Sequence, residues 1–424
     1  MHIAISALGR QSRRRILGTG ATLAGSTALS ALSARSARAV QRTPDAVASP
    51  THLPDPATIA AIVREIAERD GLRAGIYRVV VDGAELVTDA FGESMDGVPA
   101  TVDMHVRNGA VAIGYLATLV LQLVDEGVIG LDDTIDAWLP DLPEATTATL
   151  RMLLNMTAGY PDYVPNPDCV REVYANPFRI WTADELIAYG LARPRLFAPG
   201  ENWDYSHTNV VILGQALEAI TGQPLADVLR ARVLDPLGLT NTISTQTSAI
   251  SDPPLHAFSS ERKLDLGIAP ATRFYEESTF WNPSWTLAPG AVMTTDIFDM
   301  TATAIEWGEG TLLSPQSHAA MIEPRLIGFG SLLDGCANCH PLDEIYSYGL
   351  GVVLSNGWVL QNPRFGGYIG VAAYLPTEKI AIAVTATFGE DGFDEMGDYR
   401  SVTSSTDLLK AIAGTMTSQA PFPG

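Results

Sequence analysis

A serine and a lysine three residues apart can do nucleophilic chemistry when they share one face of a helix, because the lysine then activates the hydroxyl. The sequence has one such pair, Ser260 and Lys263. It lies between Pro254 and Pro270, and no apolar helical pattern follows it. We therefore predict a solvated loop without a catalytic role.

Two of the three cysteines stand close together in the string Cys336-Ala337-Asn338-Cys339-His340. The spacing matches the attachment motif of c-type haem, but a haem would also need a second axial ligand and an apolar pocket. A local disulfide between Cys336 and Cys339 is the simpler prediction for a protein outside the cytoplasm. We expect no metal and no other cofactor, and we expect Cys169 to remain a free thiol.

The N-terminus has the pattern of a twin-arginine export signal. The string Ser12-Arg13-Arg14-Arg15-Ile16-Leu17 precedes an apolar run and Ala37-Arg38-Ala39, which has the form of a cleavage site. Glycines and serines interrupt the run, so it is a poor bilayer span. We expect removal of residues 1–39, no stable membrane span afterwards, and a location in the periplasm, outside the cell or in the cell envelope.

The composition limits the class of protein and its partners. The chain has 424 residues, 46% of them hydrophobic, which is ample for a large buried core. It carries 48 acidic against 27 basic residues, a formal net charge of −21. Such a surface repels phosphate backbones and anionic lipid, so we expect no nucleic-acid partner.

Hydrophobic periodicity predicts the elements that must position any site. A helix begins at Pro56 and ends near Gly71, strands over 74–81 and 84–91 form a hairpin, and an apolar helix covers 110–126. Helices and long loops then continue to about 238. Strands return at 350–354, 358–360, 370–375 and 380–388, and a helix covers 406–415. This order predicts an α/β (α+β) fold with a helical insertion.

The expected division of the chain follows from these elements. A linker covers 40–55 and a single domain covers 56–418, followed by a tail over 419–424. Within the domain, the α/β part takes about 56–112 and 285–418, and the mostly helical part takes about 113–284.

Five motifs follow one another between residues 55 and 390. They are Ala117–Pro140, Leu150–Gly159, Phe197–Gly214, Pro236–Thr242 and Trp285–Thr295. Together they resemble the family of class C β-lactamases and DD-carboxypeptidases, which are penicillin-recognising serine hydrolases. The resemblance implies an antiparallel sheet flanked by helices, with a helical insertion subdomain.

The resemblance places the family's catalytic serine at Ala110 and its lysine at Ile113, in the first turn of the apolar helix. An alanine has no nucleophile and an isoleucine exchanges no proton, so the acyl-enzyme route of the family is predicted to be absent. No serine occurs from Met95 to Asp204, and no lysine occurs before Lys263. A shift of the alignment therefore does not restore the pair.

The family's Tyr-x-Asn motif reads Tyr205-Ser206-His207 here. One interpretation makes Tyr205 a packed aromatic side chain that stays protonated, since no lysine lowers its pKa. The other makes Tyr205 and His207 the acid and base of a residual site, with His207 titrating near neutral pH.

The family's strand motif, His-x-Gly or Lys-Thr-Gly, matches Phe365-Gly366-Gly367. The charged position is then Phe365, while Gly367 of the binding cleft is kept. The backbone N–H groups of Ala110 and Tyr368 could still form an oxyanion hole.

These observations support three hypotheses. The leading one is an exported, non-catalytic relative that binds a cell-wall peptide or another exported protein. The alternative is an esterase, amidase or DD-peptidase-like hydrolase that uses Tyr205, His207 and a water. The third is a structural protein whose cleft is packed shut by Ile113 and Phe365.

Overall fold

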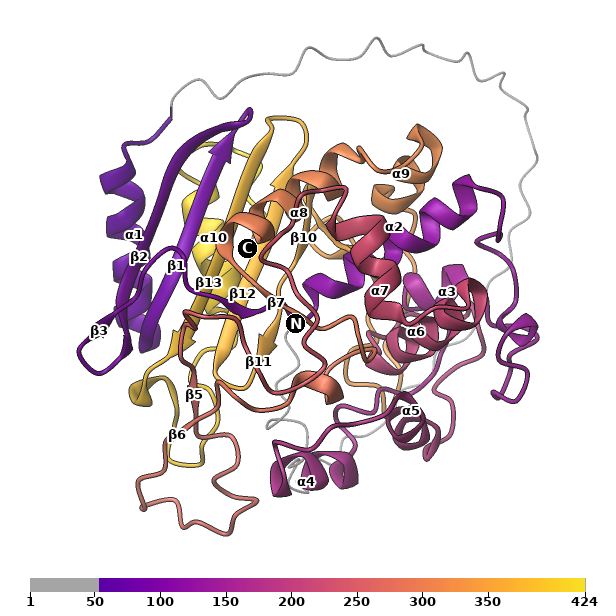
Figure 1. Ribbon diagram of the computed structural model, residues 1–424, viewed down its shortest axis with the longest axis horizontal. Coiled ribbons are helices and arrows are strands. Elements are labelled where there is room, and N and C mark those ends of the chain that lie inside the picture. The colour runs from indigo at the N-terminus through magenta and orange to yellow at the C-terminus, as the bar shows by residue number, and fades with distance from the viewer. Residues whose placement is uncertain (1–52, 424) are drawn as a thin grey trace, which may run out of the picture.

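The computed structural model describes residues 53–423, so the predicted export signal and most of the predicted linker lie outside the described residues. A sheet with helices on both faces lies beside a mostly helical region (Figure 1). Among the described residues, no helix is long and apolar enough to cross a membrane.

A nine-stranded antiparallel sheet forms the first region. Its order is β3-β2-β1-β13-β12-β10-β9-β8, and β11 pairs with β12. The strands are β1 Leu72–Val81, β2 Ala84–Met95, β3 Val98–Pro99, β8 Ser347–Tyr348, β9 Val353–Ser355, β10 Trp358–Gln361, β11 Arg364–Phe365, β12 Tyr368–Leu375 and β13 Ile380–Phe388. The remaining strands form two small antiparallel sheets of two strands each. Strand β4, Val106–Arg107, pairs with β7, Thr294–Thr295, and β5, Phe258–Ser259, pairs with β6, Glu276–Glu277.

The predicted hairpin joins β1 and β2. Asp82 and Gly83 have φ angles of 46° and 77°, which a type I′ turn requires at both central positions. The sequence of these two residues therefore sets the register that brings the N-terminal strands into the sheet.

Three helices cover the sheet. Helix α1, Pro56–Asp70, packs against α10, Ser404–Ala413, and α8, Ile297–Glu309, lies across β1, β12 and β13 (Figure 1). Helix α1 begins at Pro56 because the Asp55 carboxylate accepts the N–H of Ala57, and it ends at Gly71 in the left-handed conformation.

The helical region holds the apolar helix α2, Val111–Asp125, of which twelve residues are buried. It contacts α6, α7 and α9. The other helices here are α3 Leu150–Leu154, α4 Pro167–Ala175, α5 Ala183–Leu191, α6 His207–Thr221, α7 Leu225–Leu229 and α9 Pro315–Ile322. Burial on nearly every side fixes the position of the α2 N-terminus.

The strand expected over 350–354 begins later than predicted, at Val353. Gly351 has a φ of 74°, and a Cβ on it would lie 2.7 Å from the Cβ of Ala117. The N–H of Leu350 binds the carbonyl of Met321 instead of a neighbouring strand. Residues 350–352 therefore pack against α2 and do not pair with a neighbouring strand.

The segment expected to be a tail packs back onto the sheet. The indole N–H of Trp358 donates to the carbonyl of Gln419, and the N–H of Phe422 donates to the hydroxyl of Ser355 at 2.7 Å. Residues up to Phe422 are therefore held against β9 and β10.

Candidate functional site

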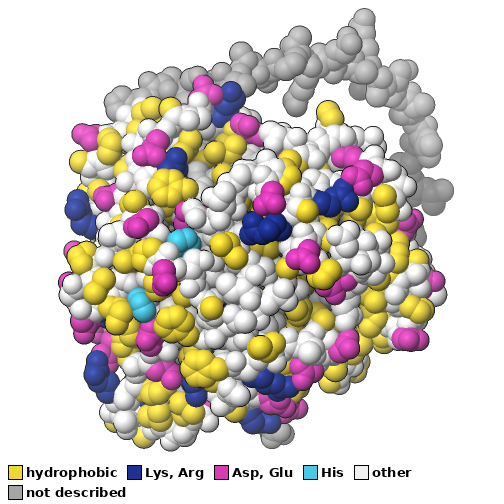
Figure 2. Space-filling model, viewed as in Figure 1, with side chains coloured by type: hydrophobic (Ala, Val, Ile, Leu, Met, Phe, Trp, Pro, Cys, Tyr) yellow, Lys and Arg dark blue, Asp and Glu magenta, His cyan; other side chains and the backbone are white. Residues whose placement is uncertain are grey.

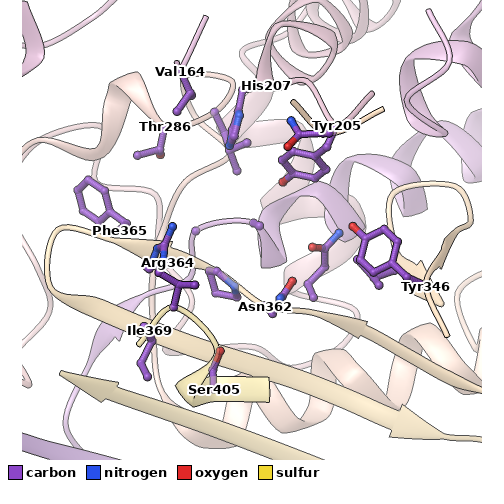
Figure 3. Close-up of a pocket in the computed structure, with 18 of the residues that line it drawn as sticks. Val164, Tyr205, His207, Thr286, Tyr346, Asn362, Arg364, Phe365, Ile369 and Ser405 are labelled. Atoms are coloured by element: carbon purple, nitrogen blue, oxygen red, sulfur yellow. The ribbon is translucent and has the colours of Figure 1, made fainter. Parts of the chain in front are cut away.

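A cavity opens where the start of α2, the segment before α6 and the end of β10 meet. The empty space in and in front of it, open solvent included, is about 1140 Å³. Tyr205 and His207 lie on one wall, and Phe365 comes from the facing side (Figure 3). Together with Ala110, which also lines the cavity, these are four of the residues that the sequence predicted.

Ala110 is the N-cap of α2 and is half-buried at the edge of the cavity. The side chain of Ile113 is 1% exposed and packs into the hydrophobic core, and Ile113 does not line the cavity. The space beside Ala110 is open, so the hypothesis of a cleft packed shut by Ile113 and Phe365 is wrong. Neither Ala110 nor Ile113 offers a nucleophile or a proton acceptor.

The rings of Tyr205 and His207 meet edge to face, with centroids 5.1 Å apart. Burial, followed by the neighbouring tyrosines and Asp162, raises the pKa of Tyr205 well above its ordinary value. The hydroxyl therefore stays protonated at neutral pH. It can donate a hydrogen bond in the cavity, but it does not accept a proton there.

A buried carboxylate, Asp162, holds the imidazole of His207. Its Oδ2 lies 3.0 Å from Nδ1 of His207, and its Oδ1 accepts the backbone N–H groups of His207 and Val164, each at 3.1 Å. A carboxylate accepts hydrogen bonds, so in this pairing Nδ1 of His207 is the donor and Nε2 is the nitrogen left for other partners. Sequence reasoning missed Asp162, which has no motif of its own and lies 45 positions before His207.

The strand end that faces Ala110 is not the predicted segment 365–367. Gln361, Asn362 and Pro363 line the cavity, and a Cβ on Gly109 would lie only 2.6 Å from the Cβ of Pro363. Gln361 therefore occupies the strand position beside the helix start, where its amide nitrogen donates to the carbonyl of Gly351 at 2.8 Å. This position holds an amide and no cation.

Gly367 and Tyr368 are not among the residues that line the cavity. The N–H of Gly367 donates to the hydroxyl of Tyr399 at 2.9 Å, and Tyr368 pairs with Phe365 across the β11–β12 turn. The predicted cleft position at Gly367 and the predicted oxyanion donor at Tyr368 thus differ from the structure. The tight turn between the two strands folds these residues back into the sheet.

The described residues that line the cavity include no aspartate or glutamate. They include Arg364, His207 and His340, together with several aromatic side chains. Arg364 lies over the ring of Tyr399 and Phe365 packs against Trp285, yet both residues reach the cavity. On the outer face seen in Figure 2, acidic and basic side chains are interspersed. The lining therefore favours a neutral or anionic ligand.

The pair Ser260 and Lys263 lies outside the cavity, but the prediction of a solvated loop is wrong. Both residues are buried, at 3% and 4% exposure. The ammonium of Lys263 donates to the carbonyls of Pro270 and Glu395, both at 2.7 Å, and the Ser260 hydroxyl donates to the carbonyl of Phe274. The pair stabilises a buried turn.

Among the described residues, one group of ligand-type side chains is close enough together to hold a metal ion: Asp204, Cys336 and Cys339. The two sulfurs form a disulfide, which is the pairing that the sequence favours over haem attachment. A disulfide offers no thiolate to a metal. Cys169 is buried and free.

Comparison with known proteins gives a family match and several relatives. Residues 59–405 match the family model described as Beta-lactamase. Penicillin-binding protein 4* of Bacillus subtilis is 33% identical over 156 residues, which cover 36% of this chain and 33% of that protein. Esterase EstB of Burkholderia gladioli is 28% identical over 204 residues, which cover 44% of this chain and 51% of that protein. The chain thus spans between a third and about half of the lengths of these two curated relatives.

A solved structure agrees over a longer stretch. The D-stereospecific amidohydrolase of Streptomyces sp. superposes with a TM-score of 0.67 at 25% sequence identity, covering 84% of this chain and 98% of that one. This agreement extends to the antiparallel sheet and the helical region together.

Proposed function

The chain belongs to the beta-lactamase family, and on that basis we propose that it is an exported, non-catalytic member that binds a short peptidic or acyl ligand in the cell envelope. One observation carries the proposal: the cavity beside Ala110 is open, while Ala110 and Ile113 lack the hydroxyl and the amine that acylation needs.

The lining supports a ligand of this kind. Trp203, Trp285 and Phe365 offer apolar contact, and the amides of Asn338 and Gln361 offer hydrogen bonds to a peptide. A lining without carboxylates suits a ligand that ends in a carboxylate. A cell-wall peptide has these features, and another exported protein could present them on an extended segment.

Binding without acylation can be tested with a fluorescent penicillin and a fluorescent peptide that ends in D-alanyl-D-alanine. Fluorescence anisotropy reports reversible binding, and intact mass reports a covalent adduct. We expect saturable binding of the peptide and no mass increase with either probe. A stoichiometric adduct at any residue would refute the proposal, and so would the absence of saturable binding.

An occluding variant shows whether the peptide sits in the cavity. Ala110→Phe fills the space beside α2 and should weaken binding at least tenfold. The matched control is Ala137→Phe, an exposed alanine in the short 3-10 helix Ile135–Ala137, which should leave binding unchanged.

Export is part of the proposal and has its own test. Changing Arg13→Lys and Arg14→Lys together should leave the full-length precursor in the cytoplasm of a host with a twin-arginine system. Processing and export that proceed unchanged would refute this part alone.

A second candidate function rests on the Asp162–His207 pair. In a hydrolase, Nε2 of His207 would take a proton from a water, Asp162 would stabilise the imidazolium, and the Tyr205 hydroxyl would donate a hydrogen bond to the developing charge. Hydrolysis of activated esters and of D-amino acid amides tests this candidate. His207→Gln should then reduce turnover at least 100-fold. His256→Gln, which changes a histidine paired with Glu277 outside the cavity, should not.

A further inference from the structure

The Cys336–Cys339 disulfide is asymmetric in its exposure. As whole residues, Cys336 is partly exposed and Cys339 is 1% exposed, although both belong to a buried group with Asp204. The backbone N–H of Cys339 donates to Sγ of Cys336 at 3.1 Å. In a reduced Cys-x-x-Cys pair, such a donor stabilises the thiolate of the outer cysteine, which is the form that reacts.

A buried carboxylate lies beside the two sulfurs. An oxygen of Asp204, Sγ of Cys336 and Sγ of Cys339 all lie within 4.8 Å of one another. Asp204 is 4% exposed and takes a hydrogen bond from the side chain of Asn338 at 3.3 Å. A disulfide that only stabilises the fold needs no carboxylate beside its sulfurs. The position of Asp204 therefore suits a role in proton transfer.

Asp204 is suited to hold a proton near neutral pH. Burial, and then the charge of Asp162, raise the pKa of Asp204 to about 7, against the opposing effects of Asn338 and Arg193. Further titratable groups on the segments packed here are Tyr205 and His207, of which His207 is paired with Asp162. The cysteine loop adds the exposed Asp334 and His340, whose ring contacts Trp203.

We propose that Cys336 and Cys339 are a reversible dithiol–disulfide site, in which an external dithiol attacks Cys336 and Asp204 transfers the proton at Cys339. The co-reactant is a dithiol, either a small molecule or a reduced Cys-x-x-Cys protein. The proposal is independent of what the neighbouring cavity binds.

The exchange has two steps. A thiolate of the dithiol attacks Sγ of Cys336, the S–S bond breaks, and the electron pair passes to Sγ of Cys339, which takes the proton of Asp204. The second thiol of the reductant then loses its proton to the Asp204 carboxylate and attacks the mixed disulfide. Cys336 leaves as a thiolate. The reductant becomes a disulfide, and the protein pair gains two electrons.

The redox state of the Cys336–Cys339 pair should also affect the wall of the cavity. Asn338 lies between the two cysteines, His340 follows them, and both line the cavity. Opening the disulfide removes a covalent constraint on this loop, so we expect the lining beside Trp203 to change with the redox state of the pair.

The test is the rate of reduction of the native full chain by dithiothreitol between pH 5.5 and 9, measured by maleimide trapping and mass spectrometry. Each rate is divided by the fraction of reductant present as thiolate. Because protonated Asp204 is the proton donor, this corrected rate should fall as the pH rises through about 7. Asp204→Asn should lack that fall and should react at least about tenfold more slowly at pH 6. Asp334→Asn, an exposed change on the same loop, is the matched control and should match the wild type.

Two serine variants test the order of attack without relying on Asp204. Cys339→Ser should leave Cys336 open to a thiol reagent, whereas Cys336→Ser should leave Cys339 unreactive in the folded protein. Burial raises the pKa of Cys169 to about 12, so this thiol should stay unlabelled and serve as an internal control. The proposal is overturned if the disulfide is reduced only on unfolding, if Cys339 is the reactive residue, or if Asp204→Asn keeps the wild-type pH profile.

Discussion

Restoring the family's lysine by Ile113→Lys should destabilise the protein far more than restoring its serine by Ala110→Ser. Ile113 is 1% exposed inside the core around α2, whereas Ala110 is half-buried at the cavity. In the first turn of α2, the N–H groups of Ala112 and Ile113 already bind the carbonyls of Gly109 and Ala110 at 3.0 Å. A serine at Ala110 therefore gains little as a cap, and we expect a change within about 0.5 kcal/mol.

The cost at position 113 comes from the charge. A lysine keeps an aliphatic stem of similar length, so most of the apolar contact survives. The ammonium would have no carboxylate partner in a core lined by apolar side chains, and an uncompensated buried charge costs about 3–5 kcal/mol. Burial lowers the pKa of such a lysine below its unfolded value. The loss should therefore be complete at pH 7 and should shrink as the pH rises towards about 10.

Urea unfolding at pH 7 and pH 10 measures both the loss and its pH dependence. The matched control is Ile113→Met, which is unbranched and uncharged and should cost less than about 1.5 kcal/mol. If Ile113→Lys lost less than about 1 kcal/mol at pH 7, the side chain would have to reach water through the cavity. The account of Ile113 as a core residue separate from the cavity would then be refuted.

Three further predictions concern groups at or near the cavity. Because the pKa of Asp204 is raised from 3.8 to about 7, its contribution to stability is present at low pH and is lost as the pH rises through about 7. Between pH 4 and 8 the wild type should therefore lose roughly 4 kcal/mol of unfolding free energy relative to Asp204→Asn, by urea titration. Gly109→Ala should cost about 2 kcal/mol more than Gly127→Ala, since both glycines have positive φ but only Gly109 faces the end of β10 at close range. Asp162→Asn should lower the unfolding free energy by about 2 kcal/mol, because it weakens charge-assisted bonds to the ring and backbone of His207; an unchanged value would contradict that role.

The elements around the cavity were predictable because each is marked in its own sequence. Asp82 and Gly83 specify a turn that few other residue pairs adopt, and the apolar run of α2 ends before Gly127. Counting along the apolar run placed Ala110 and Ile113 at the start of that helix, where they lie; that they correspond to the family's serine and lysine stays a prediction. Local pattern sufficed for these features because their conformations depend mainly on neighbouring residues.

Asp162 and Gln361 could not be found in the same way. Asp162 reaches His207 only because the loop after α3 folds against the start of α6, and no residue type or spacing signals that contact. The family's strand motif ends in a glycine, and the match to Phe365-Gly366-Gly367 rested on the two glycines there. These glycines belong to the turn between β11 and β12. The strand end beside Ala110 is set by how β10 lies in the sheet, which depends on partners far away in sequence.

The two positions that the resemblance assigns to the catalytic serine and lysine differ in burial, and the difference bears on the proposed function. At position 113, a side chain buried in the core is more stable as isoleucine than as an unpaired lysine, so stability alone accounts for the residue. At position 110, stability would favour a larger apolar side chain that fills the space and gains contacts. The space is instead open. It is lined by the imidazole of His207, which is bonded to Asp162, and by several amides and aromatic rings. An open cavity with no nucleophile at position 110 fits the proposed binding role better than a purely structural one, which would not require the space.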